Sequence, residues 1–532
     1  MLNYWWVTRP KRKLNSIPEI LACCADVSLN SEWQGNVYTH LAFEKALEDA
    51  GLKRAGPRRD QRGGGGRTYY AWISSLGLVF VQETTGQTKL TLAGEAILNG
   101  DSPVDVLKGQ ILKYQFPSPF SLSPSTSRTR VNSRFKIRPF RFLLRLLRES
   151  RLNNFLSQEE IGRIVATEAE NESDHCYERI VKRILEYRDN GPKALSDDFF
   201  TLYAPSTGKV NPKHPYSHLD DLANTMVNWL DYAQFILRET DDAGKSIIRL
   251  LPEKLDEVDA VLADGTKLID RPQESEYFQR KYGLDPSHLK DTRNLTTAKS
   301  ITAQMLVEQK VKQIFLGEAV KRPICKIDSG IIDSVADKAG ISQQTAEELL
   351  LKIYPHGAIG AFMTEYFDMA FRGRDEATDF EKATVEIFRN SFGFQACHVG
   401  PVGLSPDALI LSDTEGYQAI IDNKAYAKYS ISNDHHNRMV HNYIEGLGHY
   451  SDSLFPLAFF SYIAGGFGVN IDSQLGRITS ETGIPGSAVC VSNIIKMVEK
   501  NQISPYSHAR IRDIFSLNRQ IQMADLQGET RP

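Results

Sequence analysis

The sequence predicts a multidomain α/β protein, and three observations lead to this expectation. Its 532 residues suffice for roughly two to four domains, and the hydrophobic fraction of 41% is ample for packed cores. Before residue 290, helical stretches are followed by pairs of short apolar stretches separated by a turn. After residue 354, a helical stretch precedes a pattern typical of a β-hairpin. We therefore expect three parts: residues 1–290, a helical connector over residues 291–353, and an α/β domain over residues 354–532.

The first part contains three segments with the pattern of a winged-helix unit, in which a helix precedes a two-stranded wing. The first segment has a helix over 68–75 and strands over 78–81 and 89–92. The second begins at Ser157, which can cap a helix, and the third has its helix over 222–229. Helix-turn-helix variants of this kind read DNA in the major groove, although such units also serve only for domain packing. We expect winged-helix-like DNA-recognition units here.

The α/β domain carries the candidate catalytic residues on a predicted hairpin, with strands over 408–411 and 417–423. Asp407 directly precedes the first strand, and Asp422 and Lys424 stand at the end of the second. Because side chains alternate along a strand, Asp422 and Lys424 share one face. Two carboxylates and an ammonium group are therefore expected at one edge of a sheet.

These residue types suit phosphodiester hydrolysis. Mg²⁺ prefers one or two carboxylates, a carbonyl oxygen and retained waters, and it neutralises charge that builds on phosphate oxygens. Asp407 and Asp422 would supply the carboxylates, and Asn423 a backbone carbonyl. Lys424 would orient or help deprotonate the attacking water. The alternative is a charged turn and a surface ion pair, because both motifs are short enough to arise by chance.

The net charge of −3 speaks against a DNA-binding protein, but the distribution of charge answers this objection. One basic cluster surrounds the glycine tract Gly63–Gly66, which we expect to be flexible; a solvated loop is the alternative. A second basic run, opposed in sequence only by Glu149, continues into a helix over 140–148 whose arginines we divide between phosphate contacts and solvation. The candidate DNA-binding residues are Arg54, Arg58, Arg59, Arg62, Arg67, Arg128, Arg130, Arg134 and Lys136.

Other features exclude several classes of protein. The chain start lacks the apolar core of a signal peptide, and no stretch is apolar enough to span a membrane, so we expect a cytoplasmic protein. The six cysteines show neither zinc spacing nor a disulfide framework. The glycine-rich stretches lack the context of a phosphate-binding loop, which argues against a nucleotide-hydrolysing motor.

The candidate residues lie in stretches that resemble known nucleases. Residues 380–388, 405–408 and 420–426 resemble, in this order, the cleavage domain of the FokI restriction endonuclease, which has the PD-(D/E)xK pattern. The first half resembles the recognition region of AlwI-type type IIS restriction and nicking enzymes. The stretches that carry this second resemblance are residues 32–35, 76–81, 92–96 and 113–118. Together the two resemblances imply an enzyme whose restriction-endonuclease-like α/β domain cuts DNA at a distance from an asymmetric recognition site.

The resemblance also implies a role for Glu381, since the first helix of this nuclease class often contributes a carboxylate near the metal. The alternative is a capping box with Thr378, in which the Glu381 side chain closes the helix amino terminus. The cluster Asp434, His435, His436, with His441, is interpreted as a solvated or phosphate-contacting helix and not as a metal site.

Several alternatives stay open at this point. One such site cuts one strand at a time, so double-strand cleavage requires a transient homodimer or a partner nuclease subunit, whereas a single site suffices for a strand-specific nickase. A companion DNA methyltransferase is expected of a restriction-modification system. A non-cleaving DNA-binding regulator and a reader of modified bases are the rival interpretations; Tyr69, Tyr70 and Trp72 are the aromatic candidates for a flipped-base pocket, although they also suit a core.

Overall fold

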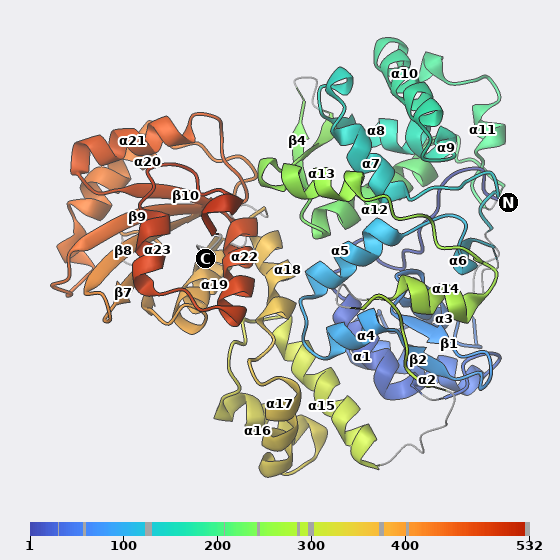
Figure 1. Cartoon of the computed structure of the whole chain (residues 1–532), viewed down its shortest axis with the longest axis horizontal. Coiled ribbons are helices and arrows are strands. Elements are labelled where there is room, and N and C mark those ends of the chain that lie inside the picture. The colour runs from blue at the N-terminus through green and yellow to red at the C-terminus, as the bar shows by residue number, and fades with distance from the viewer. Residues whose placement is uncertain are drawn as a thin grey trace. The chain divides into compact units, whose positions relative to one another are not determined.

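The computed structural model describes residues 1–29, 31–56, 60–122, 130–206, 208–241, 245–284, 288–295, 303–371, 377–400 and 404–526. The chain divides into two compact units. Unit 1 comprises Met1–Gly317 and Asp333–Leu349, and unit 2 comprises Glu318–Ile332 and Leu350–Pro532. Figure 1 shows the course of the chain through both.

Unit 1 begins with helices that surround a short antiparallel hairpin. Its first elements are α1 (Ile17–Ser28), α2 (Val37–Asp49), α3 (Gly64–Ser75), β1 (Val79–Val81), β2 (Thr88–Leu90), α4 (Leu92–Leu98) and α5 (Pro103–Lys113). In the hairpin, Val79 lies opposite Leu90. The predicted helix and both strands of the first segment are therefore present, and the helix starts four residues earlier than expected, at Gly64.

The early start of α3 corrects the expectation of a flexible glycine tract. Gly64, Gly65 and Gly66 form the first turn of α3, packed directly on α2. A Cβ atom on Gly66 would lie 2.3 Å from the backbone oxygen of His40, so only glycine permits this approach. The tract is a helix–helix contact because its glycines lack side chains, not a loop.

The rest of unit 1 is mainly helical. Its further elements are α6 (Pro119–Leu122), α7 (Pro139–Leu147), β3 (Leu156–Ser157), α8 (Gln158–Glu160), α9 (Ala166–Glu168), α10 (Asp174–Asn190), α11 (Phe199–Leu202), α12 (Ser217–Tyr232), β4 (Ile236–Thr240), β5 (Ser246–Leu250), α13 (Leu255–Ala263) and α14 (Ser275–Tyr282). Trp5, Trp72 and Trp229 are fully buried in its hydrophobic core. Trp72 is therefore a core residue, which was the alternative to its interpretation as part of a flipped-base pocket.

The second and third predicted segments share one sheet. Ser157 caps its helix with a complete capping box in which Glu160 is the partner, as the sequence suggested. The strand that ends at Ser157, β3, pairs with β5, which also pairs with β4. The helix of the third segment, α12, precedes β4 and β5 as predicted.

Helices also fill the predicted connector. They are α15 (Ala303–Ala319), α16 (Ser329–Ala339) and α17 (Gln343–Ile353). The boundary between the two units falls within α15 and within α16, so this region contributes to both compact units.

Unit 2 is a five-stranded mixed sheet between helices. Its elements are α18 (Ile359–Met369), α19 (Ala377–Asn390), β6 (Gln395–His398), β7 (Ala408–Ser412), β8 (Tyr417–Lys424), α20 (Asn433–Asn437), β9 (Leu457–Ala464), α21 (Ile471–Thr482), β10 (Gly486–Cys490), α22 (Val491–Ile503) and α23 (His508–Phe515). The strand order is β10-β9-β8-β7-β6. Strands β6, β7 and β8 are antiparallel neighbours, whereas β8, β9 and β10 run parallel. The predicted hairpin is thus confirmed as β7 and β8.

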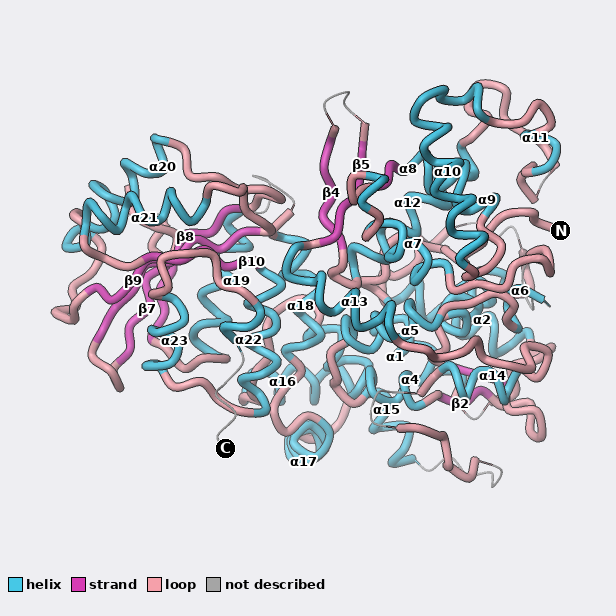
Figure 2. Tube along the Cα trace, turned by 45° about the horizontal axis from the view of Figure 1, so that its top comes forward, coloured by secondary structure: helices cyan, strands magenta, loops and turns pink. Residues whose placement is uncertain are grey.

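Helices cover both faces of this sheet (Figures 1 and 2). On one face, α21 and the segment after α20 pack Leu475 and Met439 against Ile420 and Phe460. On the other face, α19 packs against β6, β7 and β8. Strand β8 is the central strand, and its first seven residues are all buried. The residues at the end of β8 are therefore held in place by a buried strand.

In the described part of the chain, no helix is both long and apolar enough to cross a membrane. All six cysteines are free.

Candidate active site

The hairpin brings the three motif residues together. Asp422 and Lys424 project on the same side of β8, and Lys424 Nζ lies 2.5 Å from Asp422 Oδ2. Asp407 stands just before β7, where its Oδ2 accepts a hydrogen bond from the backbone N–H of Asn423 at 2.6 Å. The side chain of Asp422 is 3% exposed, so this is not a solvated surface ion pair.

Burial and like charge perturb this group strongly. Burial raises the pKa of the Asp407 carboxyl well above the ordinary aspartate value, and the neighbouring Asp422 raises it further, while Lys424 opposes the shift. Burial alone would lower the pKa of Lys424, but Asp422 and Asp407 reverse the effect and raise it. The site therefore concentrates two acidic groups that one lysine does not fully compensate.

The donor set fits a hard divalent cation. Asp422 Oδ1 is buried and has no hydrogen-bond partner among the described atoms. An unpartnered buried carboxylate oxygen costs free energy unless a cation or a donor approaches it. Among the described residues, no group of three or more His, Cys, Asp or Glu side chains is arranged to hold a metal ion.

Glu381 lies beside the aspartate pair, and the contact that holds it there was not indicated by the sequence. Its Oε2 lies 2.8 Å from Nε2 of His398, the last residue of β6. A Cβ atom on Gly400 would lie within 3.6 Å of Glu381 Oε2, His398 Nε2 and Asp407 Cα, so these groups surround one glycine. The capping-box alternative is wrong because Thr378 lies inside α19 and not at its cap.

Sequence reasoning missed the residues that fix the hairpin in place. The side chain of Asn423 donates to Thr384 Oγ1 at 2.6 Å, and Thr384 in turn lies 2.9 Å from the Tyr366 hydroxyl. This buried chain of hydrogen bonds fastens β8 to α19 and α18. Thr384 gave only a helical-periodicity signal, and a polar contact on a buried face has no sequence signature.

The residues of the histidine cluster have separate partners. His435 Nδ1 lies 2.9 Å from the Tyr429 hydroxyl, whereas His436 contacts Glu481 at 2.7 Å. His441 contacts Glu445 on the following turn. The expectation of solvation is wrong for His436, which is buried. It packs between the segment after β8 and α21, a contact that only the tertiary fold creates.

The candidate DNA-binding residues separate into three groups. Arg54, Arg62, Arg130 and Lys136 are exposed. Arg67 is half-buried and pairs with Asp60. Arg58, Arg59 and Arg128 lie outside the described residues.

Arg134 requires a correction. Its guanidinium donates to Asn3 Oδ1, Glu170 Oε1 and the backbone oxygens of Asn3 and Thr167. It therefore fixes the first residues of the chain within unit 1, and its guanidinium is engaged by several acceptors of the chain itself.

The arginines of α7 and its continuation are also engaged within unit 1. Arg138 pairs with Glu172, Arg145 with Asp174, and Arg148 with Asp259. The sequence run showed only Glu149 beside these arginines, because the other acids come from segments distant along the chain. These arginines therefore form ion pairs within unit 1, and the pairs of Arg145 and Arg148 are partly exposed to solvent.

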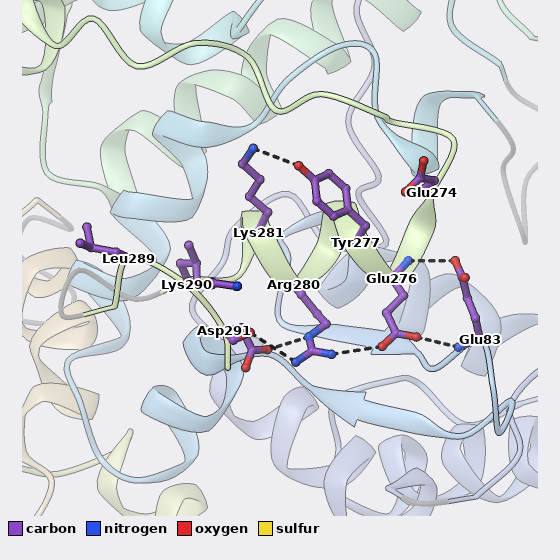
Figure 3. A pocket seen from close by; sticks show the side chains of 10 residues that line it. Glu83, Glu274, Glu276, Tyr277, Arg280, Lys281, Leu289, Lys290 and Asp291 are labelled. Carbon is purple, nitrogen blue, oxygen red and sulfur yellow. Dashed lines mark hydrogen bonds and ion pairs between the residues drawn. The ribbon is translucent and has the colours of Figure 1, made fainter. Parts of the chain in front are cut away.

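A pocket of about 580 Å³ lies beside α14. Figure 3 shows its charged side chains joined to one another: Arg280 contacts Glu276 and Asp291, and Glu276 accepts a hydrogen bond from the backbone of Glu83. Its charges are largely matched internally, which distinguishes it from the active site.

The same stretches match known nuclease families. A family model for the FokI cleavage domain matches residues 340–522, which include all the active-site residues named above. A second family model, described as AlwI restriction endonuclease, matches residues 74–348, more than half of the chain. The molecule is thus a type II site-specific deoxyribonuclease. The chain belongs to the AlwI restriction endonuclease family and is a type IIS enzyme with a FokI-like cleavage domain. A non-cleaving regulator is not the function of this family.

Comparison with solved structures gives three distant likenesses. Restriction endonuclease FokI is 15% identical, with 97% of this chain and 99% of that chain covered and a TM-score of 0.29. FokI bound to DNA is 14% identical, with 93% and 89% covered and a TM-score of 0.28. The BpuJ1 endonuclease binding domain, in complex with pyrene- and phenanthrene-modified DNA, is 15% identical, with 52% and 96% covered and a TM-score of 0.36. No curated protein matches the chain.

Proposed function

We propose that this type IIS enzyme hydrolyses DNA phosphodiester bonds with Mg²⁺ held by Asp407, Asp422 and the backbone carbonyl of Asn423. The observation that carries the proposal is the buried carboxylate pair, in which Asp422 Oδ1 has no partner among the described atoms. A hard cation with oxygen preference matches this donor set. When bound, Mg²⁺ would stabilise the negative charge that develops on the phosphate.

The chain's own residues supply the remaining chemistry. Lys424 Nζ lies against Asp422, in position to orient the attacking water and to offset phosphate charge. His398 holds the Glu381 carboxylate beside Asp407, where it can accept a hydrogen bond from the attacking water. The hydrogen bond from the Asn423 backbone N–H holds the Asp407 carboxylate beside the end of β8. The nucleophile is water, with no covalent intermediate.

Recognition is proposed to reside in residues 1–290, with the helices of 291–353 as connector and residues 354–532 as nuclease. Each of the helix–hairpin segments at α3 and α12 has the elements of a winged helix. The exposed basic residues Arg54, Arg62, Arg130 and Lys136 would contact phosphates, which position a protein on DNA without reading its sequence. Arg58, Arg59 and Arg128 belong to the same proposed basic clusters.

One chain holds one such site, so double-strand cleavage needs a second nuclease domain. We propose a transient homodimer through the nuclease domain, with a partner nuclease subunit as the alternative. Strand-specific nicking is the outcome if neither forms. A cytoplasmic restriction-modification system with a companion methyltransferase is the proposed setting.

The test is cleavage of supercoiled plasmid with Mg²⁺, with ends mapped by sequencing. We expect discrete ends at a fixed offset from a shared asymmetric sequence. These ends should be absent with Asp407→Ala or EDTA and retained with Asp413→Ala, an exposed aspartate beyond the far end of β7. Cleavage that persists in Asp407→Ala would overturn the proposed site. Open circles alone would identify a nickase.

A further inference from the structure

Unit 1 contains a second pocket, of about 560 Å³, where α2, α3 and the β1–β2 hairpin meet. Its walls come from distant parts of the sequence: Trp33 precedes α2, Tyr70 lies on α3, Phe80 lies on β1, and Pro119 and Pro272 close the rim. A volume of this size lies within the range of about 300–1,000 Å³ typical of small-ligand sites. The volume of the pocket is larger than a single nucleobase requires, so one base can be accommodated.

One wall of this pocket is a preformed aromatic stack. The rings of Trp33 and Tyr70 lie 3.8 Å apart with an interplanar angle of 18°. Phe43 and His40 support the indole edge-on, with His40 at 4.6 Å. Both stacked residues are at most 5% exposed and so have already lost their side-chain freedom. A rigid aromatic wall can bind another flat ring at little further entropic cost.

Polar groups accompany the aromatic wall. The exposed side chains of Gln34 and Gln273 line the pocket, as do two buried residues, His40 and Gln82. The Gln82 amide already donates to the Leu295 carbonyl oxygen and accepts from the Thr85 hydroxyl. His40 is 5% exposed, and its Nδ1 has no hydrogen-bond partner among the described atoms. Since Nε2 lies 2.8 Å from the Trp33 carbonyl oxygen, Nε2 carries the proton and Nδ1 is left as an acceptor. The glutamine amides are of the kind that reads the edge of a base, whereas His40 Nδ1 is enclosed beside the aromatic wall.

Charge at this pocket also suits a nucleotide. Arg67 lines it and pairs with Asp60, and Arg62, which precedes α3, is exposed. Glu83 is the single acidic lining residue, whereas four acidic residues line the pocket of Figure 3. With one arginine and one glutamate in its lining, the aromatic pocket does not repel a phosphate backbone.

We propose that the aromatic pocket receives a nucleobase turned out of the DNA duplex, so that recognition includes one extrahelical base. The inference rests on DNA being the substrate of this family, and it adds a mode of reading that a major-groove helix does not supply. Proteins that extract a base hold it by stacking and by hydrogen bonds to its edge, which are the two kinds of group present here.

The test compares binding of duplexes in EDTA, so that DNA is bound without cleavage. Each duplex contains the mapped recognition sequence with a mismatch at one base pair. A mismatched base leaves the double helix at a lower free-energy cost. The protein should therefore bind a duplex about tenfold more tightly when the mismatch lies at the base pair whose base enters the pocket. In full-length Trp33→Leu and Gln34→Ala proteins the gain should shrink to about threefold or less. Gln34 is exposed, so its truncation should leave the fold intact, which circular dichroism can verify.

Gln344→Ala serves as the matched control, because this exposed glutamine on α17 does not line the pocket. It should retain the full gain. If no mismatch position tightens binding, the proposal is overturned. It is also overturned if the gain persists in both pocket variants while they remain folded. Plasmid cleavage by the wild-type protein, measured in parallel with Mg²⁺, tests the metal site separately.

Discussion

Two carboxylates at the end of one hairpin, buried Asp422 and partly buried Asp407, carry the proposed chemistry and also lower the stability of the fold. Asp407 is raised in pKa by burial first and by Asp422 second. The Asp407 contribution to stability is fully present below the ordinary aspartate pKa and is lost as the pH rises through the raised value. At neutral pH the metal-free protein therefore carries an electrostatic cost that a bound cation would relieve.

Asp407→Asn should consequently stabilise the metal-free protein while abolishing cleavage. The amide oxygen can still accept from the Asn423 backbone, but the buried charge is gone. We expect a gain of about 1–3 kcal/mol at pH 8, the scale of an imperfectly paired buried polar group. Urea unfolding in EDTA measures it, with Asp413→Asn as an exposed control that should change little. A less stable Asp407→Asn protein would contradict this account.

Glu381→Gln should lower the cleavage rate by about 10²–10⁴-fold, the usual contribution of a positioned acid–base group. Its carboxylate is held beside Asp407 by His398, whereas Glu386 on the same helix pairs with Arg389 and is half-exposed. Glu386→Gln is therefore the matched control and should cut at the wild-type rate. Single-turnover kinetics at saturating DNA distinguishes the two variants, and equal rates would remove Glu381 from the site.

At the scale of elements, close packing outweighs local propensity. The glycine tract favours flexibility when read alone, yet it forms the first turn of α3 because α2 lies too near for any side chain. The same helix places Arg67 and Tyr70 at the aromatic pocket. The contact between α2 and α3 therefore positions part of the recognition region.

Gly66→Ala should destabilise unit 1, although alanine is the better helix former. The added methyl group would lie 2.3 Å from the His40 backbone oxygen, and overpacking of this kind costs about 1–3 kcal/mol. Gly109 on α5 has no atom within 4 Å of an added Cβ. Gly109→Ala should thus stabilise by about 0.4–1 kcal/mol. Thermal unfolding of both variants checks the opposite signs, and a shift of the same sign in both would contradict the packing argument.

At the scale of the whole molecule, one chain offers one nuclease site. A phosphodiester bond in the second strand lies outside the reach of a site already occupied by the first. Under the proposed transient homodimer, cutting both strands depends on a second cleavage domain, and so on protein concentration.

Linear product should accordingly form at a rate that continues to rise with enzyme concentration after every recognition site is occupied, while nicking should saturate. Nicked and linear plasmid are quantified on gels across an enzyme titration at fixed DNA. A protein bearing Asp422→Ala, added in excess, should not support cutting of the second strand. A linear fraction independent of enzyme concentration would mean that one chain cuts both strands.

The sequence by itself determined the hairpin, the convergence of Asp422 and Lys424 and the helix that carries Glu381, because alternation and helical periodicity are local properties. The fold of residues 408–424 follows from them directly. Tertiary structure alone decided that His398 holds Glu381, that Thr384 fastens Asn423, and that the α7 arginines pair with distant acids. These contacts join segments far apart in the chain, and no local pattern records which partner a side chain will meet.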